Sequence, residues 1–131
     1  MIDHVSVAVR DLQKAEPFYA ALLAPLGLVK LREWPEAAIG FGKKYPEFWI
    51  NRRATMEWVA GDSGVHVCLR APDRAAVDAF HAAALKAGGS SDGAPGLRPH
   101  YYAGYYAAFV CDPDGNRIEA VTFLRDAERA G

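Results

Sequence analysis

Two histidines and one glutamate combine residue types and positions that suit metal chemistry. His4 begins the segment HVSVAVRD, His66 begins the segment HVCLRAPD, and Glu119 lies in the later segment RIEAV. Imidazole nitrogens and a carboxylate oxygen bind divalent metal ions, and three protein ligands leave coordination positions open for a substrate. The opposing hypothesis is that both histidines are ordinary exposed or hydrogen-bonded residues and that the glutamate is solvated.

The two histidine segments belong to an internal repeat. Residues 4–11 match residues 66–73, and the stretches that follow carry Phe18 and Phe80 at equivalent places. Self-similarity of this kind defines the structural unit before any element is assigned. The sequence therefore predicts two equivalent units in which His4 and His66 occupy matching positions, and this equivalence favours a shared site.

The alternation of apolar and polar residues predicts which way these side chains point. In the first segment Val5, Val7 and Val9 alternate with polar or small residues, which is typical of a half-buried strand. The valines are expected to face a helical layer, which leaves His4 on the opposite face, and His66 shares this orientation. Glu119 lies between two apolar residues of the last strand. We therefore expect all three side chains on the same side of the sheet.

The elements that must position them form two βαβββ modules. We predict an α+β fold with module one at about residues 1–61 and module two at about residues 62–126, within one domain over residues 1–131. A helix is expected between the Asp11 cap and Pro25, and another over residues 73–87. The strand candidates are residues 4–9, 28–34, 37–41, 48–50, 54–60, 65–70, 105–111 and 117–124, whereas residues 90–99 are expected to be a loop.

Composition excludes several other classes of protein. The net charge is −1 and no basic cluster exceeds the pair Arg52-Arg53, so we expect no nucleic-acid partner. No apolar run is long enough for a membrane span, and we expect no membrane partner. Cys68 and Cys111 lie in apolar runs and are predicted to be reduced, buried thiols of a cytoplasmic protein.

Aromatic residues and a third histidine supply weaker candidates. His100 and Tyr102 precede the penultimate strand, where a loop could cross a cavity mouth, and they are candidate catalytic residues for orienting an oxyanion or transferring a proton. The alternative is that tyrosines here fill a sheet surface. Trp49 and Trp58 are expected either to wall a cavity that takes a flat or apolar ligand or to lie in the core.

The strand that begins at His4, the second strand at His66 and above all the segment FVCDPDGNRIE at residues 109–119 resemble the vicinal-oxygen-chelate superfamily. This family includes glyoxalase I, bleomycin-resistance proteins and extradiol dioxygenases. The resemblance implies paired modules whose sheet curls around a cavity, with helices on the outer face. It also implies a divalent metal ion (Zn, Ni, Mn, Fe or Mg) held by His4, His66 and Glu119. Trp49 stands where glyoxalase I has a further glutamate, which leaves three ligands.

Two functions follow from this resemblance. The first is a metal-dependent enzyme that chelates adjacent oxygens of a small-molecule substrate, as a glyoxalase-like lyase or isomerase or as a dioxygenase. The second is a metal-free binding protein that sequesters a drug-like molecule, as bleomycin-resistance proteins do. The resemblance also implies a homodimer. Whether His4 and His66 meet within one chain or across two is open at this stage.

Overall fold

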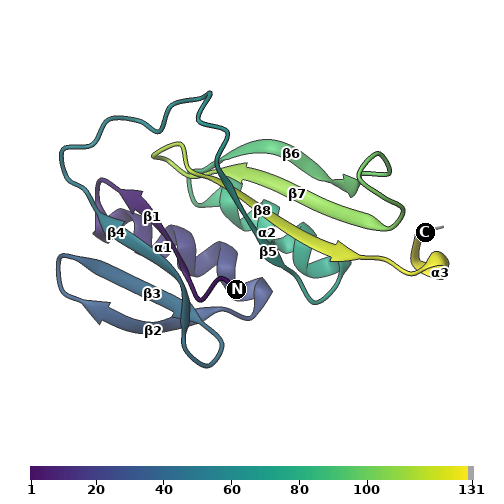
Figure 1. Ribbon diagram of the computed structural model, residues 1–131, viewed down its shortest axis with the longest axis horizontal. Helices are drawn as coiled ribbons and strands as arrows, with labels where there is room; N and C mark the ends of the chain where they lie inside the picture. Colours follow the sequence, from purple (N-terminus) through teal and green to yellow (C-terminus); the bar gives the residue numbers. More distant parts are fainter. Residues whose placement is uncertain (130–131) are drawn as a thin grey trace.

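The computed structural model describes residues 1–129 and contains the predicted unit twice (Figure 1). The first unit consists of β1 (Val5–Val9), α1 (Leu12–Leu23), η1 (Ala24–Leu26), β2 (Val29–Trp34), β3 (Ala38–Gly42) and β4 (Pro46–Arg52). The second consists of β5 (His66–Arg70), α2 (Arg74–Lys86), β6 (Ser90–Leu97), β7 (Tyr105–Cys111) and β8 (Arg117–Phe123), followed by α3 (Asp126–Arg129). The predicted α+β fold with two tandem βαβββ modules is confirmed. The last two residues of the predicted domain lie outside the described residues.

Each unit forms its own four-stranded mixed sheet. The strand orders are β1-β4-β3-β2 and β5-β8-β7-β6, and in both sheets the first strand runs parallel to the last. Ser6 pairs with Trp49 in the first sheet, and Cys68 pairs with Glu119 in the second. Ser6 and Cys68 lie two residues beyond the matching histidines. Trp49 therefore occupies in the first unit the position that Glu119 occupies in the second.

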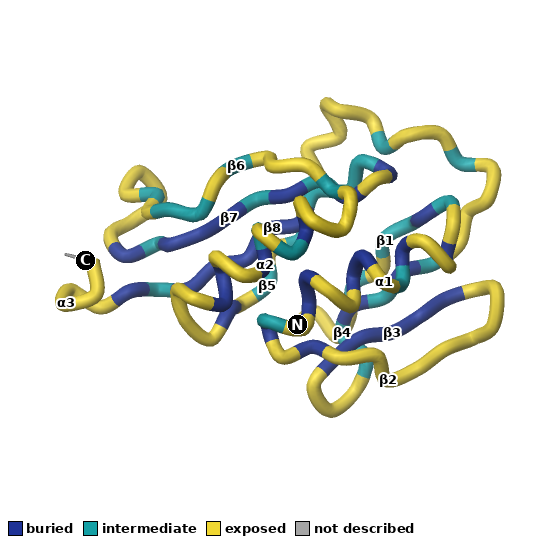
Figure 2. The backbone as a smooth tube through the Cα atoms, turned by 180° about the vertical axis from the view of Figure 1, so that it is seen from behind, coloured by how far each residue is buried: buried dark blue, intermediate teal, exposed yellow. Residues whose placement is uncertain are grey.

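The helices cover one side of both sheets, whose other sides face the viewer in Figure 1. Asp11 and Asp73 cap α1 and α2 as predicted, because each side chain accepts a hydrogen bond from a backbone N–H in the first turn. The two helices pack against each other, and one cluster of buried apolar residues includes members from both units (Figure 2). Phe18 and Phe80, the equivalent pair of the repeat, both belong to it.

Two element predictions are wrong. The segment 54–60 contains no strand, because both sheets are complete without it, and it forms part of the connection between the units. The segment 90–97, predicted as loop, is the edge strand β6. Its register against β7 shifts at Gly93, and an edge position with such irregularities tolerates glycine and proline that a central strand would not.

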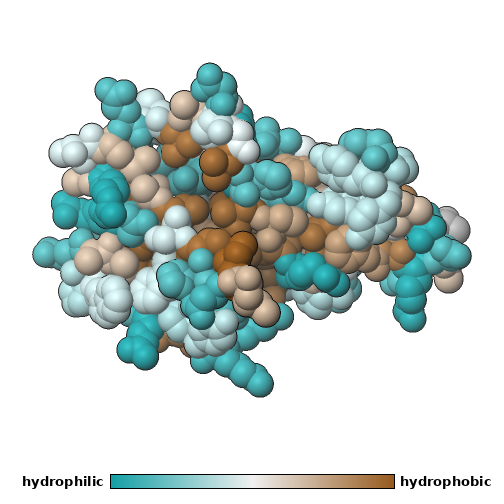
Figure 3. Space-filling model, viewed as in Figure 1, coloured by the Kyte–Doolittle hydropathy of each residue, from teal (hydrophilic) through white to brown (hydrophobic). Residues whose placement is uncertain are grey.

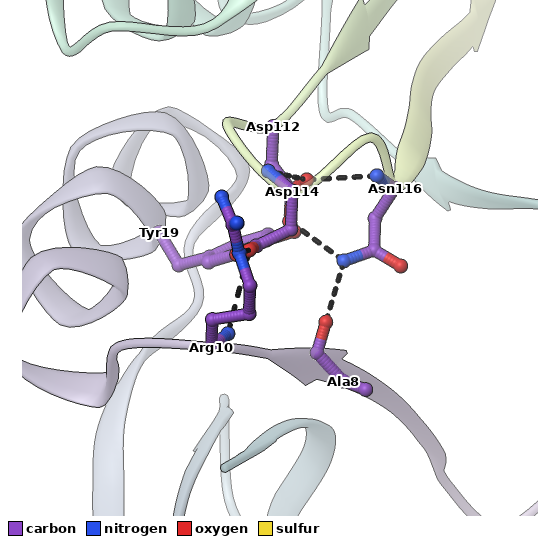
Figure 4. A network of polar contacts seen from close by, with 6 residues as sticks. All are labelled: Ala8, Arg10, Tyr19, Asp112, Asp114 and Asn116. Carbon is purple, nitrogen blue, oxygen red and sulfur yellow. Dashed lines mark hydrogen bonds and ion pairs between the residues drawn. The ribbon is translucent and has the colours of Figure 1, made fainter. Parts of the chain in front are cut away.

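A polar network joins the turn after β7 to the first unit (Figure 4). The hydroxyl of Tyr19 donates to Oδ2 of Asp112 over 2.5 Å, and Nε of Arg10 donates to Oδ1 of Asp114 over 2.8 Å. The side-chain amide of Asn116 donates to a backbone carbonyl of β1 over 2.8 Å. Burial, followed by the charge of Asp112, raises the pKa of Tyr19, so its phenol stays a hydrogen-bond donor. The predicted turn therefore also fixes how the two units pack.

Candidate functional site

His66 and Glu119 form the centre of the candidate site. Their strands, β5 and β8, are parallel neighbours, and Nε2 of His66 lies 2.9 Å from Oε1 of Glu119. The Glu119 side chain is 3% exposed, whereas that of His66 is 48% exposed. The predicted shared face is confirmed for this pair, because Ile118 and Ala120 on either side of Glu119 are buried in the core.

Tyr105 holds the other oxygen of this carboxylate. Its hydroxyl donates to Oε2 of Glu119 over 2.5 Å. Burial, then the hydrogen bond to Glu119, raises the pKa of Tyr105, so the phenol remains protonated at neutral pH. Sequence reasoning grouped this tyrosine with the phenols that could orient an oxyanion or transfer a proton, and it did not predict the contact with Glu119. A signal was available, because Tyr105 lies four residues from Phe109, which pairs with Glu119 in the ladder, and so shares its face of the sheet.

Cys68 lies on the same face and stays a neutral thiol. The prediction that both cysteines are buried is wrong, because Cys68 is an exposed residue of β5 and Cys111 is half-buried. Partial burial and the neighbouring Glu119 carboxylate raise its pKa to about 12. The reactive form of cysteine is the thiolate, which is scarce at neutral pH when the pKa is this high. Cys68 is therefore unsuited to nucleophilic attack, and Glu119 and His66 are the groups on this face with chemistry to offer.

His4 directly precedes β1, which belongs to the other sheet. Its Nδ1 is 2.8 Å from Oδ1 of Asp3, and both side chains are exposed. It lines a depression of about 590 Å³, here called the His4 hollow, together with Trp34, Tyr45, Trp49, Asn51 and Arg53. Within residues 1–129 no three His, Cys, Asp or Glu side chains are placed to share one ion. The structure thus brings His66 and Glu119 together and leaves His4 apart from them in the same chain.

Trp49 forms part of the wall of the His4 hollow. Its ring lies 5.2 Å from that of Trp34, centroid to centroid. A Cβ atom at Gly40 would approach the Trp49 ring to 3.0 Å, so glycine there gives the indole room to lie on the sheet. The alternative prediction, that Trp49 lies in the core, is wrong, because this side chain is half-buried and lines the hollow. Trp58 lies in the connection between the units and packs under the Arg10 guanidinium, 3.8 Å from its ring centroid.

His100 and Tyr102, the predicted catalytic residues, lie in the loop between β6 and β7. The His100 ring is 4.4 Å from that of Tyr101, and the Tyr102 ring stacks on Phe123 at 5.4 Å. The Tyr102 ring is also 5.7 Å from that of Tyr105. Within residues 1–129 neither His100 nor Tyr102 makes a side-chain hydrogen bond to another residue. The tyrosine whose hydroxyl contacts the Glu119 carboxylate is Tyr105, not the predicted Tyr102.

The His66–Glu119 pair fits two ligands of one metal ion. Nitrogen and oxygen ligands bonded to an ion at about 2.1 Å lie about 3 Å apart when the two bonds are at right angles. The observed separation of 2.9 Å is close to this spacing. In the structure the two atoms share a hydrogen bond, which an ion bound by both would replace. Tyr105 supplies the outer hydrogen bond that orients a ligating carboxylate. The pair is thus suited to a divalent ion that takes further ligands from elsewhere.

The fold and this pair define a class of small two-module domains with a candidate metal site on a sheet face. Residues 1–120 match the model of the glyoxalase/bleomycin resistance protein/dioxygenase superfamily, and the chain belongs to this family. No curated protein matches the chain. No helix among residues 1–129 is long and apolar enough to cross a membrane.

Solved structures agree with this assignment. A glyoxalase/bleomycin resistance protein from Albidiferax ferrireducens T118 is 31% identical, with a TM-score of 0.75 over 90% of this chain and 94% of that chain. A glyoxalase-related enzyme from Fulvimarina pelagi is 18% identical, with a TM-score of 0.68 over 92% of this chain and 86% of that chain. A lactoylglutathione lyase from Agrobacterium tumefaciens is 21% identical, with a TM-score of 0.62 over 92% of each chain. Because the latter two are only 18% and 21% identical, their likeness to this chain shows the fold alone.

Proposed function

We propose that this protein is a metal-dependent enzyme in which His4, His66 and Glu119 hold one divalent ion. The observation that carries the proposal is the His66–Glu119 pair, with 2.9 Å between its ligand atoms and a buried carboxylate fixed by Tyr105. When bound, a zinc, nickel, manganese, iron or magnesium ion would stabilise negative charge that develops on adjacent oxygens of a small substrate. Either a glyoxalase-like lyase or isomerase reaction or a dioxygenase reaction is compatible with this role.

The chain's own residues would position the site. Tyr105 orients Glu119, and Cys68 stays protonated beside it. His100 and Tyr102 are proposed to act on the substrate from the loop before β7, as oxyanion-orienting or proton-transfer groups. A reducing compartment such as the cytoplasm suits the two free thiols, Cys68 and Cys111.

The third ligand, His4, is proposed to come from a second copy of the chain. Within one chain the His4 hollow and the His66–Glu119 pair belong to different sheets. In a two-fold dimer each chain can offer His4 to one site and His66 with Glu119 to the other. Apolar side chains gather across the middle of the face that carries both sheets (Figure 3), and Met1, Ile2 and Val65 are exposed. An exposed apolar patch is typical of a protein interface.

A second candidate function is a metal-free protein that sequesters a flat small molecule. Trp49 favours it, because this indole occupies the position that Glu119 has in the other unit and an indole does not ligate a cation. The His4 hollow, at about 590 Å³, is within the range of about 300–1,000 Å³ that small-molecule sites span. This function needs none of the three proposed metal ligands.

Metal content separates the two functions. The protein is purified without an affinity-tag metal or a chelator, and its metal is measured before and after incubation with zinc, nickel, manganese, iron and magnesium salts. We expect about one ion per chain in the wild type and a large loss in the Glu119→Ala variant. The Glu47→Ala variant removes a half-buried glutamate of β4 that is not among the proposed ligands and should keep its metal. Wild-type protein that stays without metal contradicts the enzyme proposal and leaves the binding protein.

A further inference from the structure

Arg98 and His66 line a second hollow, which lies on the second sheet. This depression of about 440 Å³, the His66 hollow, is lined by residues that include His66, Asp92, Arg98, Tyr101, Phe109 and Arg117. It lies next to the His66–Glu119 pair, because His66 belongs to both. Arg98 follows the end of β6, the strand whose glycine- and proline-rich sequence had predicted a loop.

The Arg98 side chain is held against its own strand. Nη1 donates to the Gly96 carbonyl over 2.8 Å and Nη2 donates to the Ala94 carbonyl over 2.7 Å. The guanidinium carbon lies 5.4 Å from the centroid of the Phe109 ring. These contacts fix a half-buried guanidinium in one place, which lowers the entropy cost of binding a ligand there.

Two glycines of β6 make the room that this guanidinium occupies. A Cβ atom at Gly96 would lie 3.2 Å from Nη1 of Arg98, and one at Gly93 would lie 3.2 Å from Nη2. The Gly93 Cβ would also approach Cδ1 of Phe109 to 2.9 Å. The glycines that weaken β6 as a strand therefore form a cradle for Arg98.

The Arg98 guanidinium has further N–H donors and a positive charge in addition to its two hydrogen bonds. A guanidinium has five N–H donors, and the two carbonyls take two of them. The other three have no acceptor within residues 1–129, and Arg98 has no carboxylate partner there. Arg117, in the same hollow, is paired with Asp92 at 3.5 Å. The hollow thus carries a fixed positive charge that an anion could complete.

We propose that the His66 hollow is an oxyanion subsite in which Arg98 binds a carboxylate or phosphate group of the substrate. The planar guanidinium fork matches two oxygens of such a group. The placement of the substrate's reacting end near His66 and Glu119 rests on the proposed function, whereas anion binding by Arg98 does not. The substrate class is then a small acid, and neutral compounds of the same shape are poor ligands.

The test is a titration of metal-free protein, treated with a chelator, at constant ionic strength. The probes are benzoate, inorganic phosphate and the neutral compound benzyl alcohol. Binding is followed by NMR shifts of the Arg98 Nε–Hε signal in the wild type, and dissociation constants are measured by calorimetry in the wild type and in every variant. We expect one or both anions to shift this signal, and benzyl alcohol to leave it in place. Dissociation constants should rise about tenfold or more in the Arg98→Gln variant. The Arg125→Gln variant, which removes an exposed arginine beyond β8, should bind as the wild type does.

Each outcome decides the proposal. Binding of benzoate alone assigns a carboxylate, and binding of phosphate alone assigns a phosphate. Failure of both anions to bind, equal binding in Arg98→Gln, or equal loss in Arg125→Gln would overturn it. If Arg98→Gln does not fold, the wild-type shift and the charge-retaining Arg98→Lys variant, which lacks the fork and should bind benzoate more weakly, decide instead. Because no metal is present, failure here is separate from failure of the metal site.

Discussion

Replacing Tyr105 by phenylalanine tests how the candidate metal site is held together. The change removes one hydroxyl group and with it the 2.5 Å hydrogen bond to Oε2 of Glu119, while the 2.9 Å contact between Glu119 and His66 remains. A hydrogen bond to a charged group contributes about 1.5–3 kcal/mol, which corresponds to about a 10- to 100-fold change in a binding constant. We therefore expect the metal dissociation constant to rise about 10- to 100-fold in Tyr105→Phe.

The assay is competition between metal-free protein and a coloured chelator for zinc or manganese ions. Tyr106→Phe is a matched control, because Tyr106 donates to Oδ1 of Asp78 over 2.6 Å and lies on the opposite face of β7. Both variants lose one tyrosine hydrogen bond, so thermal unfolding should report a loss of stability in each. Only Tyr105→Phe should weaken metal binding.

Two results would refute this reasoning. Unchanged metal affinity in Tyr105→Phe would mean that Tyr105 does not orient Glu119 for an ion. An equal loss in Tyr106→Phe would mean that both substitutions act through general destabilisation of the second sheet.

Three further predictions concern stability and reactivity. Tyr19→Phe should lower the free energy of unfolding by about 1.5–3 kcal/mol at neutral pH. Because the folded-state pKa of Tyr19 is raised, its contribution is complete below its unfolded pKa of about 10 and is lost as the pH rises further. The difference from wild type, measured by urea unfolding, should therefore shrink in strong alkali; a constant difference would contradict the assignment. Gly40→Ala should displace Pro46 and the Trp49 indole and change tryptophan fluorescence, because the new Cβ would lie 2.7 Å from the Pro46 Cβ and 3.0 Å from the Trp49 ring; an unchanged spectrum would argue against the packing. Cys68, with a pKa of about 12, should react with iodoacetamide at pH 7.5 at least about a hundredfold more slowly than a peptide thiol, and rapid labelling would contradict its neutral state.

Local patterns predicted the parts of the fold that depend on neighbouring residues in sequence. The alternation that begins at His4, the aspartate caps and the turn at residues 112–116 all occur where expected. The resemblance to glyoxalase I predicted Trp49 at the position of that enzyme's glutamate, and the strand registers place Trp49 where Glu119 lies in the second unit.

What the sequence could not predict depends on tertiary contacts. The strand β6 is stabilised by pairing with β7 although its glycines disfavour a strand, and Arg98 fills the space they leave. Tyr105 gains its role only when β7 lies against β8. The separation of His4 from His66 follows from how the units pack, and contacts such as that between Arg10 and Asp114 fix this packing.

The most direct test of the central claim combines two variants that each lack one proposed metal ligand. His4→Ala and His66→Ala are each expected to retain little metal alone. When they are unfolded, mixed and refolded together, half of the dimers contain one chain of each kind, and each has one complete site, so about one quarter of the wild-type metal content should return. A mixture of His66→Ala with Glu119→Ala, which both damage the second unit, should recover none. Recovery confined to the first mixture is the predicted result; no recovery, from a wild-type protein that does bind metal, would contradict a site shared between two copies.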